Sequence, residues 1–92
     1  MIPQMESRPR LAPGCRFSAL TGQTRMLMMP ERALRLRGPS LQIVERCDGK
    51  HTVSEIVAEL RSVYSKADPG KVEHDVLEYL ERLQQERALD FD

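Results

Sequence analysis

The chain has 92 residues, 40% of them hydrophobic, and its 14 lysines and arginines balance its 14 aspartates and glutamates. This length supports one compact domain with a modest core and leaves little room for a buried catalytic cleft. A net charge of zero gives no general attraction to nucleic acid or to an anionic membrane. No run approaches the roughly 20 apolar residues of a membrane helix. Two distant cysteines without a secretory leader favour the cytoplasm.

The first 14 residues differ in composition from the rest of the chain. They hold three of the six prolines, together with Gly14 and only scattered apolar side chains. Such a segment adds little to a hydrophobic core. We therefore expect a flexible lead-in without regular structure over residues 1–14, and one folded domain over residues 15–92.

Three short strands are predicted at the start of this domain. Residues 15–20 roughly alternate between apolar and polar, residues 21–23 (Thr-Gly-Gln) suit a turn, and residues 24–29 complete a β-hairpin. Pro30 cannot donate a hydrogen bond to a neighbouring strand, so it ends the second strand. Over residues 33–37, two leucines alternate with arginines, which predicts a short third strand.

A first helix follows the third strand. Residues 38–40 (Gly-Pro-Ser) interrupt the strand, and proline or serine suits the first turn of a helix. Asp48-Gly49 then stops it, because glycine accepts a positive φ that other residues resist. Its apolar positions recur at spacings of three, at Leu41, Val44 and Cys47.

Two longer amphipathic helices complete the chain. Thr52 and Glu55 form the pattern of a capping box, which starts the second helix. Asp68 and Pro69 provide an N-cap and a first-turn proline for the third, which should end near Glu86. The apolar faces are Val53, Ile56, Val57, Leu60, Val63 and Tyr64 in the second helix, and Val72, Val76, Leu77, Tyr79, Leu80 and Leu83 in the third.

Three strands followed by three amphipathic helices predict an α+β domain. The expected fold is a small winged helix-turn-helix-like domain, with a three-stranded antiparallel sheet placed before the three helices.

No residue pattern points to catalysis or to a metal site. Cys47, Asp48 and His51 are close in sequence, but no second Cys or His element completes a four-ligand set. The Asp48-Gly49 turn separates Cys47 from His51, and His74 lies between two acidic residues. The GxSxG, HExxH and GxGxxG motifs are missing. We expect no enzyme, no metal and no cofactor, with Cys47 packed in the core.

Two side-chain clusters are more typical of a binding protein. The methionines of the second strand either fill the core or form an adaptable binding surface. Arg32, Arg35 and Arg37 form a basic stripe, which is either a solvated strand face or an attraction for an acidic partner. A short third strand at the edge of the sheet would also offer unpaired backbone groups to an extended peptide.

The order and spacing of these motifs resemble the PqqD family over about residues 10–90. The most specific part is Pro-Glu-Arg followed at this distance by Cys-Asp-Gly. One departure is residues 37–40, where the family more usually has a polar entry to an Ala-rich helix. The matching segments are Arg16-Phe17, Pro30-Glu31-Arg32, Leu41 to Val44, Cys47-Asp48-Gly49, Thr52-Val53-Ser54-Glu55-Ile56, Leu60, Tyr64, Asp75-Val76, Leu80 and Leu83.

This resemblance implies a peptide chaperone of pyrroloquinoline quinone (PQQ) biosynthesis, a peptide recognition element of a modified-peptide pathway. Such a protein binds the precursor peptide PqqA and presents it to PqqE, a radical S-adenosylmethionine enzyme. The family's binding mode adds the peptide as a strand on residues 33–37, packed against the last helix. The implied peptide-binding residues are Ala33, Leu34, Arg35, Leu36, Arg37, Lys71, Val72, Val76, Tyr79 and Leu80. Pro30, Asp48, Gly49 and Asp75 match motif positions and would shape the site or contact the enzyme partner.

Two other functions remain open from the sequence. A winged-helix DNA-binding module would need a basic recognition helix, whereas the last two helices carry many exposed glutamates that repel phosphate. A self-associating structural module, such as a homodimer, could form because an uncovered edge strand can pair with its own copy.

Overall fold

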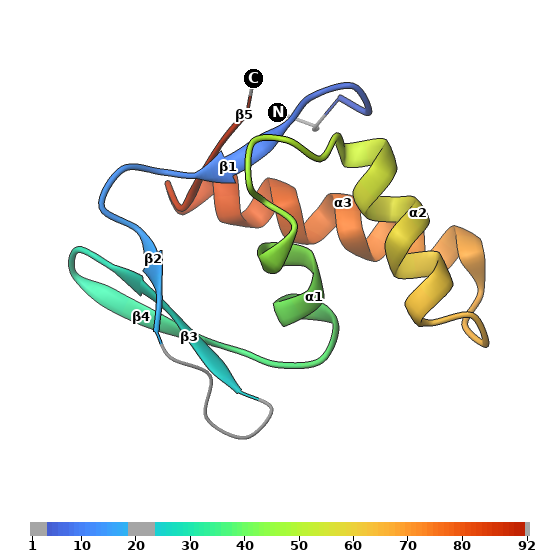
Figure 1. Cartoon of the computed structure of the whole chain (residues 1–92), viewed down its shortest axis with the longest axis horizontal. Helices are drawn as coiled ribbons and strands as arrows, with labels where there is room; N and C mark the ends of the chain where they lie inside the picture. Colours follow the sequence, from blue (N-terminus) through green and yellow to red (C-terminus); the bar gives the residue numbers. More distant parts are fainter. Residues whose placement is uncertain (1–3, 19–23, 92) are drawn as a thin grey trace.

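A computed structural model describes residues 4–18 and 24–91. In Figure 1, one sheet of three strands lies beside three helices, and a second pair of strands brings the two ends of the chain together. The elements are β1 (Pro9–Leu11), β2 (Arg16–Phe17), β3 (Arg25–Met29), β4 (Arg32–Leu36), α1 (Pro39–Glu45), α2 (Val53–Val63), α3 (Pro69–Gln85) and β5 (Leu89–Phe91). The turn predicted over residues 21–23 lies outside the described residues.

The main sheet has the antiparallel order β2-β3-β4. Pro30 and Glu31 form the two-residue connection between β3 and β4, and Met29 faces Arg32 across it. The prediction of an α+β domain with a three-stranded antiparallel sheet and three helices is confirmed. The third strand begins and ends one residue earlier than predicted. The winged helix-turn-helix description stays a prediction.

A second sheet of two strands was not predicted. β1 pairs antiparallel with β5, with Pro9 opposite Phe91 and Leu11 opposite Leu89. Pro9 is buried. The expectation that residues 1–14 lack regular structure is therefore wrong over residues 9–11. Each strand has only three residues, and a pairing between the two ends of a chain leaves no local pattern in the sequence.

Side-chain caps mark the start of α2 and α3, as predicted. The Thr52 side chain accepts a hydrogen bond from the Glu55 N–H, and the Glu55 carboxylate accepts one from the Thr52 N–H, which completes the capping box of α2. Asp68 caps α3, and Pro69 occupies its first turn. α1 begins at Pro39 after Gly38, which has φ +60°. No helix among the described residues is long and apolar enough to span a membrane.

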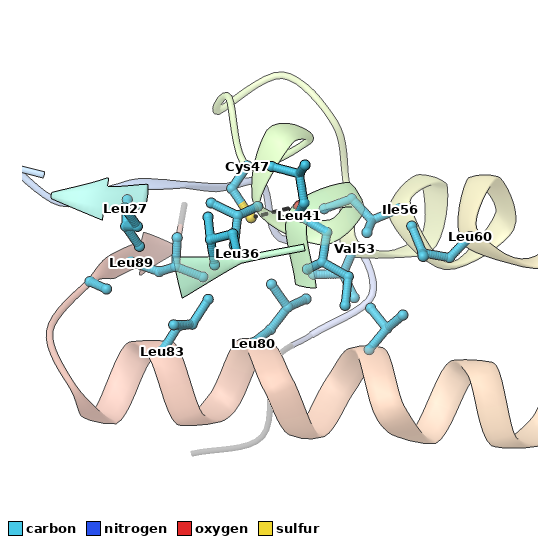
Figure 2. Close-up of a cluster of buried hydrophobic side chains, with 14 of the residues drawn as sticks. Leu27, Leu36, Leu41, Cys47, Val53, Ile56, Leu60, Leu80, Leu83 and Leu89 are labelled. Carbon is cyan, nitrogen blue, oxygen red and sulfur yellow. Dashed lines mark hydrogen bonds between the residues drawn. The ribbon is translucent and has the colours of Figure 1, made fainter. Parts of the chain in front are cut away.

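The core lies between the β3-β4 hairpin, the three helices and the β5 end of the chain. Figure 2 shows Leu36 from β4 and Leu80 and Leu83 from α3 pointing into it, and all three are essentially inaccessible to solvent. Cys47 is buried there as predicted, although it lies just beyond the end of α1. Val63, which was predicted on the apolar face of α2, is 48% exposed because it is the last residue of that helix.

Candidate functional site

The outer edge of the main sheet is formed by β4. The direction of its backbone groups follows from the neighbouring strand. Ser18 N–H donates to the Met26 carbonyl at 2.9 Å, and Met26 N–H donates to Ser18 Oγ at 2.9 Å, so the backbone of Met26 faces β2. Backbone groups alternate in direction along a strand, so Leu27 faces β4 and bonds with Leu34.

The same alternation leaves two residues of β4 with backbone groups that point away from the sheet. These are Ala33 and Arg35, and no described residue pairs with their outward N–H and C=O groups. Arg37 would come next, but Ser40 Oγ accepts from its N–H at 3.1 Å and donates to its carbonyl at 2.9 Å. The open edge is therefore short, with four backbone groups from Ala33 and Arg35 available to an extended partner.

The chain runs from β4 into α1 alongside α3. At one end, Arg32 Nη2 donates to Glu86 Oε1 at 2.7 Å. Further along, the Tyr79 side chain of α3 lies beside Ser40, at the start of α1. Partial burial raises the pKa of the Tyr79 hydroxyl, against a smaller lowering effect of the Ser40 side chain. α3 thus forms a wall beside the open edge.

The structure divides the predicted peptide-binding residues into two groups. Three are fully buried core residues, namely Leu36, Val76 and Leu80, and of these Val76 also lines an apolar pocket. The other seven are exposed or half-buried, namely Ala33, Leu34, Arg35, Arg37, Lys71, Val72 and Tyr79. The leucine and valine core positions would therefore support the site from beneath, while the seven others remain candidates for direct contact.

An apolar pocket of about 140 Å³ lies near the end of this wall. Val72 and Val76 of α3 line it together with Pro39, at the start of α1, and Asp75. The remaining lining residues are Ile43, Leu60, Tyr64 and Ala67. One predicted motif residue, Asp75, therefore lines an apolar pocket that could accommodate a side chain of a bound peptide.

A larger hollow of about 600 Å³ lies at the opposite end, where the β3-β4 turn meets the end of α3. Pro30, another predicted motif residue, lines it. The other lining residues are Pro13, Met29, Glu31, Arg32, Glu86 and Arg87. Sequence reasoning missed Glu86, because it lies 54 residues from Arg32 and no local pattern joins them.

Charge is distributed unevenly between the sheet and the helix beside it. Residues 15–37 contain five arginines and one acidic residue, Glu31. α3 contains four carboxylates against one lysine and one arginine. The open edge of β4 therefore belongs to the basic part of the molecule, which has the sign that attracts an acidic peptide, whereas α3 beside it is net acidic.

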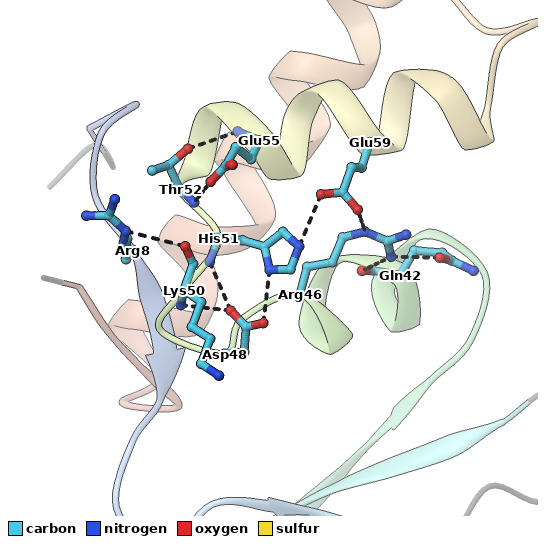
Figure 3. A network of polar contacts seen from close by, with 9 residues as sticks. All are labelled: Arg8, Gln42, Arg46, Asp48, Lys50, His51, Thr52, Glu55 and Glu59. Atoms are coloured by element: carbon cyan, nitrogen blue, oxygen red, sulfur yellow. Dashed lines mark hydrogen bonds and ion pairs between the residues drawn. The ribbon is translucent and has the colours of Figure 1, made fainter.

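Asp48 and Gly49, the other predicted motif residues, lie in the loop between α1 and α2, where Figure 3 shows the contacts of Asp48. The Asp48 carboxylate accepts hydrogen bonds from the N–H groups of Lys50 and His51 and from the His51 ring, at 2.8–3.0 Å. Partial burial pushes the pKa of Asp48 upward, but these hydrogen bonds outweigh it and lower the pKa to about 2. Gly49, at φ +77°, donates its N–H to the Pro9 carbonyl at 2.9 Å. These contacts explain both residues structurally, and their role in docking stays a prediction.

The loop continues into a polar network, which accounts for His51. In Figure 3, the His51 ring lies between Asp48 and Glu59, and its Nε2 is 3.1 Å from Glu59 Oε2. Arg46 Nε donates to Glu59 Oε1 at 2.9 Å. The network therefore joins the end of α1 to α2, and His51 acts within it as a connecting group.

The Cys47 thiol is not prepared for nucleophilic chemistry. Burial, with a smaller contribution from the negative charge of Asp48, raises its pKa to about 12, so the thiolate is scarce at neutral pH. Its Sγ lies 3.3 Å from the Ile43 carbonyl, to which it donates a hydrogen bond. Within residues 4–18 and 24–91, no three His, Cys, Asp or Glu side chains are grouped so that they could hold a metal ion.

Close relatives cover nearly the whole chain. A "PqqA binding protein" of Xanthomonas axonopodis pv. citri is 33% identical over 91% of both chains, and one of Pseudomonas aeruginosa is 33% identical over 87% of this chain and 86% of its own. A "Bifunctional coenzyme PQQ synthesis protein C/D" of Methylorubrum extorquens is 36% identical over 89% of this chain, which corresponds to 22% of that protein.

Solved structures agree on the fold. The solution NMR structure of the PqqD truncation of Methylobacterium extorquens PqqCD, a stand-alone recognition element for ribosomally synthesized and post-translationally modified peptides (RiPPs), has a TM-score of 0.70 at 35% identity over 89% of this chain and 87% of its own. The heterocyclase TruD has a TM-score of 0.60 at 18% identity over 94% of this chain and 12% of its own, which shows a shared fold. The family model "Coenzyme PQQ synthesis protein D (PqqD)" matches residues 25–89, and the chain belongs to the PqqD family.

Proposed function

We propose that this protein is a non-catalytic recognition element that binds a PqqA-type precursor peptide as an added strand on β4. The observation that carries the proposal is the open edge at Ala33 and Arg35, whose outward backbone groups lie beside the α3 wall. Backbone hydrogen bonds at such an edge give affinity for any extended peptide, and side-chain pockets give selectivity.

The relatives support this peptide as the ligand. Proteins that are 33% identical over nearly the full chain are named PqqA binding proteins, and the matching NMR structure is that of a RiPP recognition element. The basic sheet gives the site the sign of charge that favours an acidic partner. The apolar pocket lined by Val72 and Val76 would receive an apolar side chain of the peptide.

Two further associations belong to the proposal. The bound peptide would be presented to the radical S-adenosylmethionine enzyme PqqE, with Pro30 in the β3-β4 turn and Asp75 on α3 as candidate contact positions. Without peptide, the same edge could pair with a second copy of the chain, so that a homodimer and the peptide complex compete for one surface. We also propose a cytoplasmic location, which the free thiols of Cys15 and Cys47 support.

Isothermal titration of the protein with a synthetic PqqA-type peptide encoded in the same genome tests the proposal. We expect saturable binding of one peptide per chain. A scrambled peptide of identical composition serves as the control for non-specific charge attraction, and random duplex DNA tests the nucleic-acid alternative. Equal affinity for the native and the scrambled peptide, or no binding of either, would refute sequence-selective recognition.

A further inference from the structure

One carboxylate is held between two arginines at the end of the β4 edge. Arg32 Nη2, from the strand, lies 2.7 Å from Glu86 Oε1, and Arg82 Nε, from α3, lies 3.0 Å from Glu86 Oε2. The two arginines therefore bind different oxygens of the same group. We call Arg32, Arg82 and Glu86 the carboxylate clamp. It borders the hollow lined by Pro30 and Arg87, so it is open to molecules that arrive along the edge.

The bond between Arg32 and Glu86 can be exchanged at low cost. The Arg32 side chain is 51% exposed and that of Glu86 is 22% exposed, and ion pairs this close to solvent contribute little to stability. Glu86 is also the C-cap residue of α3, where the helix dipole disfavours a negative charge. Arg82, one turn earlier, remains as its partner if Arg32 is withdrawn. Another carboxylate could therefore replace Glu86 as the ion-pair partner of the Arg32 guanidinium.

We propose that Arg32 recognises a carboxylate of the bound peptide, which takes the place of Glu86. This inference rests on the proposed function, because it assigns a chemical specificity to the same edge. Arginine binds carboxylates through two parallel hydrogen bonds, so the exchange gives Arg32 a partner of the same chemical kind. In the free protein Glu86 occupies this position, and it competes with the peptide for Arg32.

The geometry also limits where in the peptide this carboxylate lies. Arg32 is the first residue of β4 and precedes Ala33 and Arg35, whose backbone groups are open. A peptide strand that runs antiparallel to β4, the commoner arrangement, passes Arg32 with its carboxyl-terminal part. The recognised Asp or Glu therefore lies on the carboxyl-terminal side of the residues that pair with Ala33 and Arg35.

The test combines a protein variant with peptide variants. Glu86→Gln keeps the shape of the side chain and removes the competing charge. Affinity for the synthetic PqqA-type peptide should rise roughly twofold to fivefold, a range set by the small contribution of an exposed ion pair. The matched control is Glu78→Gln, which removes one carboxylate charge from α3, where Glu78 pairs with His74 rather than with an arginine among the described residues. Each Asp and Glu of the peptide is also replaced in turn by Asn or Gln.

The results separate the clamp from the proposed function. We expect Glu78→Gln to leave affinity nearly unchanged, and the gain from Glu86→Gln to disappear for one particular amide-substituted peptide. Equal gains in both protein variants would show general charge repulsion and overturn the clamp, as would a gain that persists with every peptide. Normal binding by the wild type with no effect of Glu86→Gln overturns the clamp alone. No binding by the wild type overturns both proposals.

Discussion

Replacing Ala33 by proline tests the open edge with little change to the fold. Ala33 is exposed, and its N–H points away from β3, so no hydrogen bond of the sheet is lost. Proline is tolerated in strands at such edge positions, where the missing N–H faces solvent. Leu36→Pro would be different, because Leu36 is fully buried and its N–H faces β3. We expect Ala33→Pro to unfold at a urea concentration close to that of the wild type.

The expected loss of binding follows from one hydrogen bond. An added strand would use the outward N–H of Ala33 as a donor, and proline removes that donor without changing the charge of the site. A typical hydrogen bond contributes about 0.5–1.5 kcal/mol net. At 1.4 kcal/mol for each factor of ten, this corresponds to a roughly twofold to twelvefold rise in Kd.

Isothermal titration with the PqqA-type peptide measures this loss directly. Ala33→Ser is the matched control, because it changes the exposed side chain and retains the N–H, so its Kd should stay near that of the wild type. Circular dichroism and urea unfolding establish that both variants are folded. If folded Ala33→Pro protein binds the peptide as tightly as Ala33→Ser does, the strand-addition mode on β4 is wrong.

Three further predictions concern the fold. Leu80→Ala, at a fully buried side chain, should lower the free energy of unfolding by about 2–5 kcal/mol. Val63→Ala, at a side chain that is 48% exposed, should change it by less than about 0.5 kcal/mol. Similar urea midpoints for the two variants would contradict the core described above. Thr52→Ala removes half of the capping box and should cost about 0.5–2 kcal/mol, and Thr52→Ser should restore most of it; an equal loss in both would point away from the hydroxyl. The folded-state pKa of Asp48 is lowered to about 2 despite partial burial, so the ionised carboxylate stabilises the fold fully above about pH 4 and loses this effect as the pH falls toward 2. The difference in unfolding free energy between wild type and Asp48→Asn should therefore shrink over that interval. A difference independent of pH would contradict this role of the Asp48 carboxylate.

The parts of the fold that depend on neighbouring residues could be predicted from the sequence. The capping box at Thr52 and the Asp68-Pro69 start of α3 both involve contacts within four residues, and both were predicted at the correct positions. The strands β3 and β4 were both predicted, because Pro30 limits one of them and alternation marks the other. Each of these signals is local, so one sequence is enough to reveal it.

Contacts between distant residues were not accessible in the same way. The pairing of Pro9 with Phe91 joins the two ends of the chain through strands of three residues, too short to show alternation. The position of Val63 depended on where α2 ends relative to its neighbours, so helical periodicity alone misplaced it in the core.

For the site, the sequence predicted the edge strand and the helix, but not which of their side chains are buried or which residues of the two elements are in contact. Leu34 and Leu36 follow the same alternation, yet Leu36 belongs to the buried core cluster, whereas Leu34 is only partly buried and packs against that cluster. The contact of Arg32 with Glu86 joins the strand to the end of the helix. Contacts of this kind depend on how the strand and the helix pack, and no local sequence pattern predicts them.

The β1–β5 pair has a consequence for how this fold can be combined with other proteins. Residues near both ends lie side by side in it, and Figure 1 shows this pair of strands away from β4. A domain with adjacent ends can be inserted into a surface loop of a host protein, or circularly permuted, without stretching either connection. The open edge of β4 would remain accessible in such a chimera, so the inserted domain could still bind its peptide within the host protein.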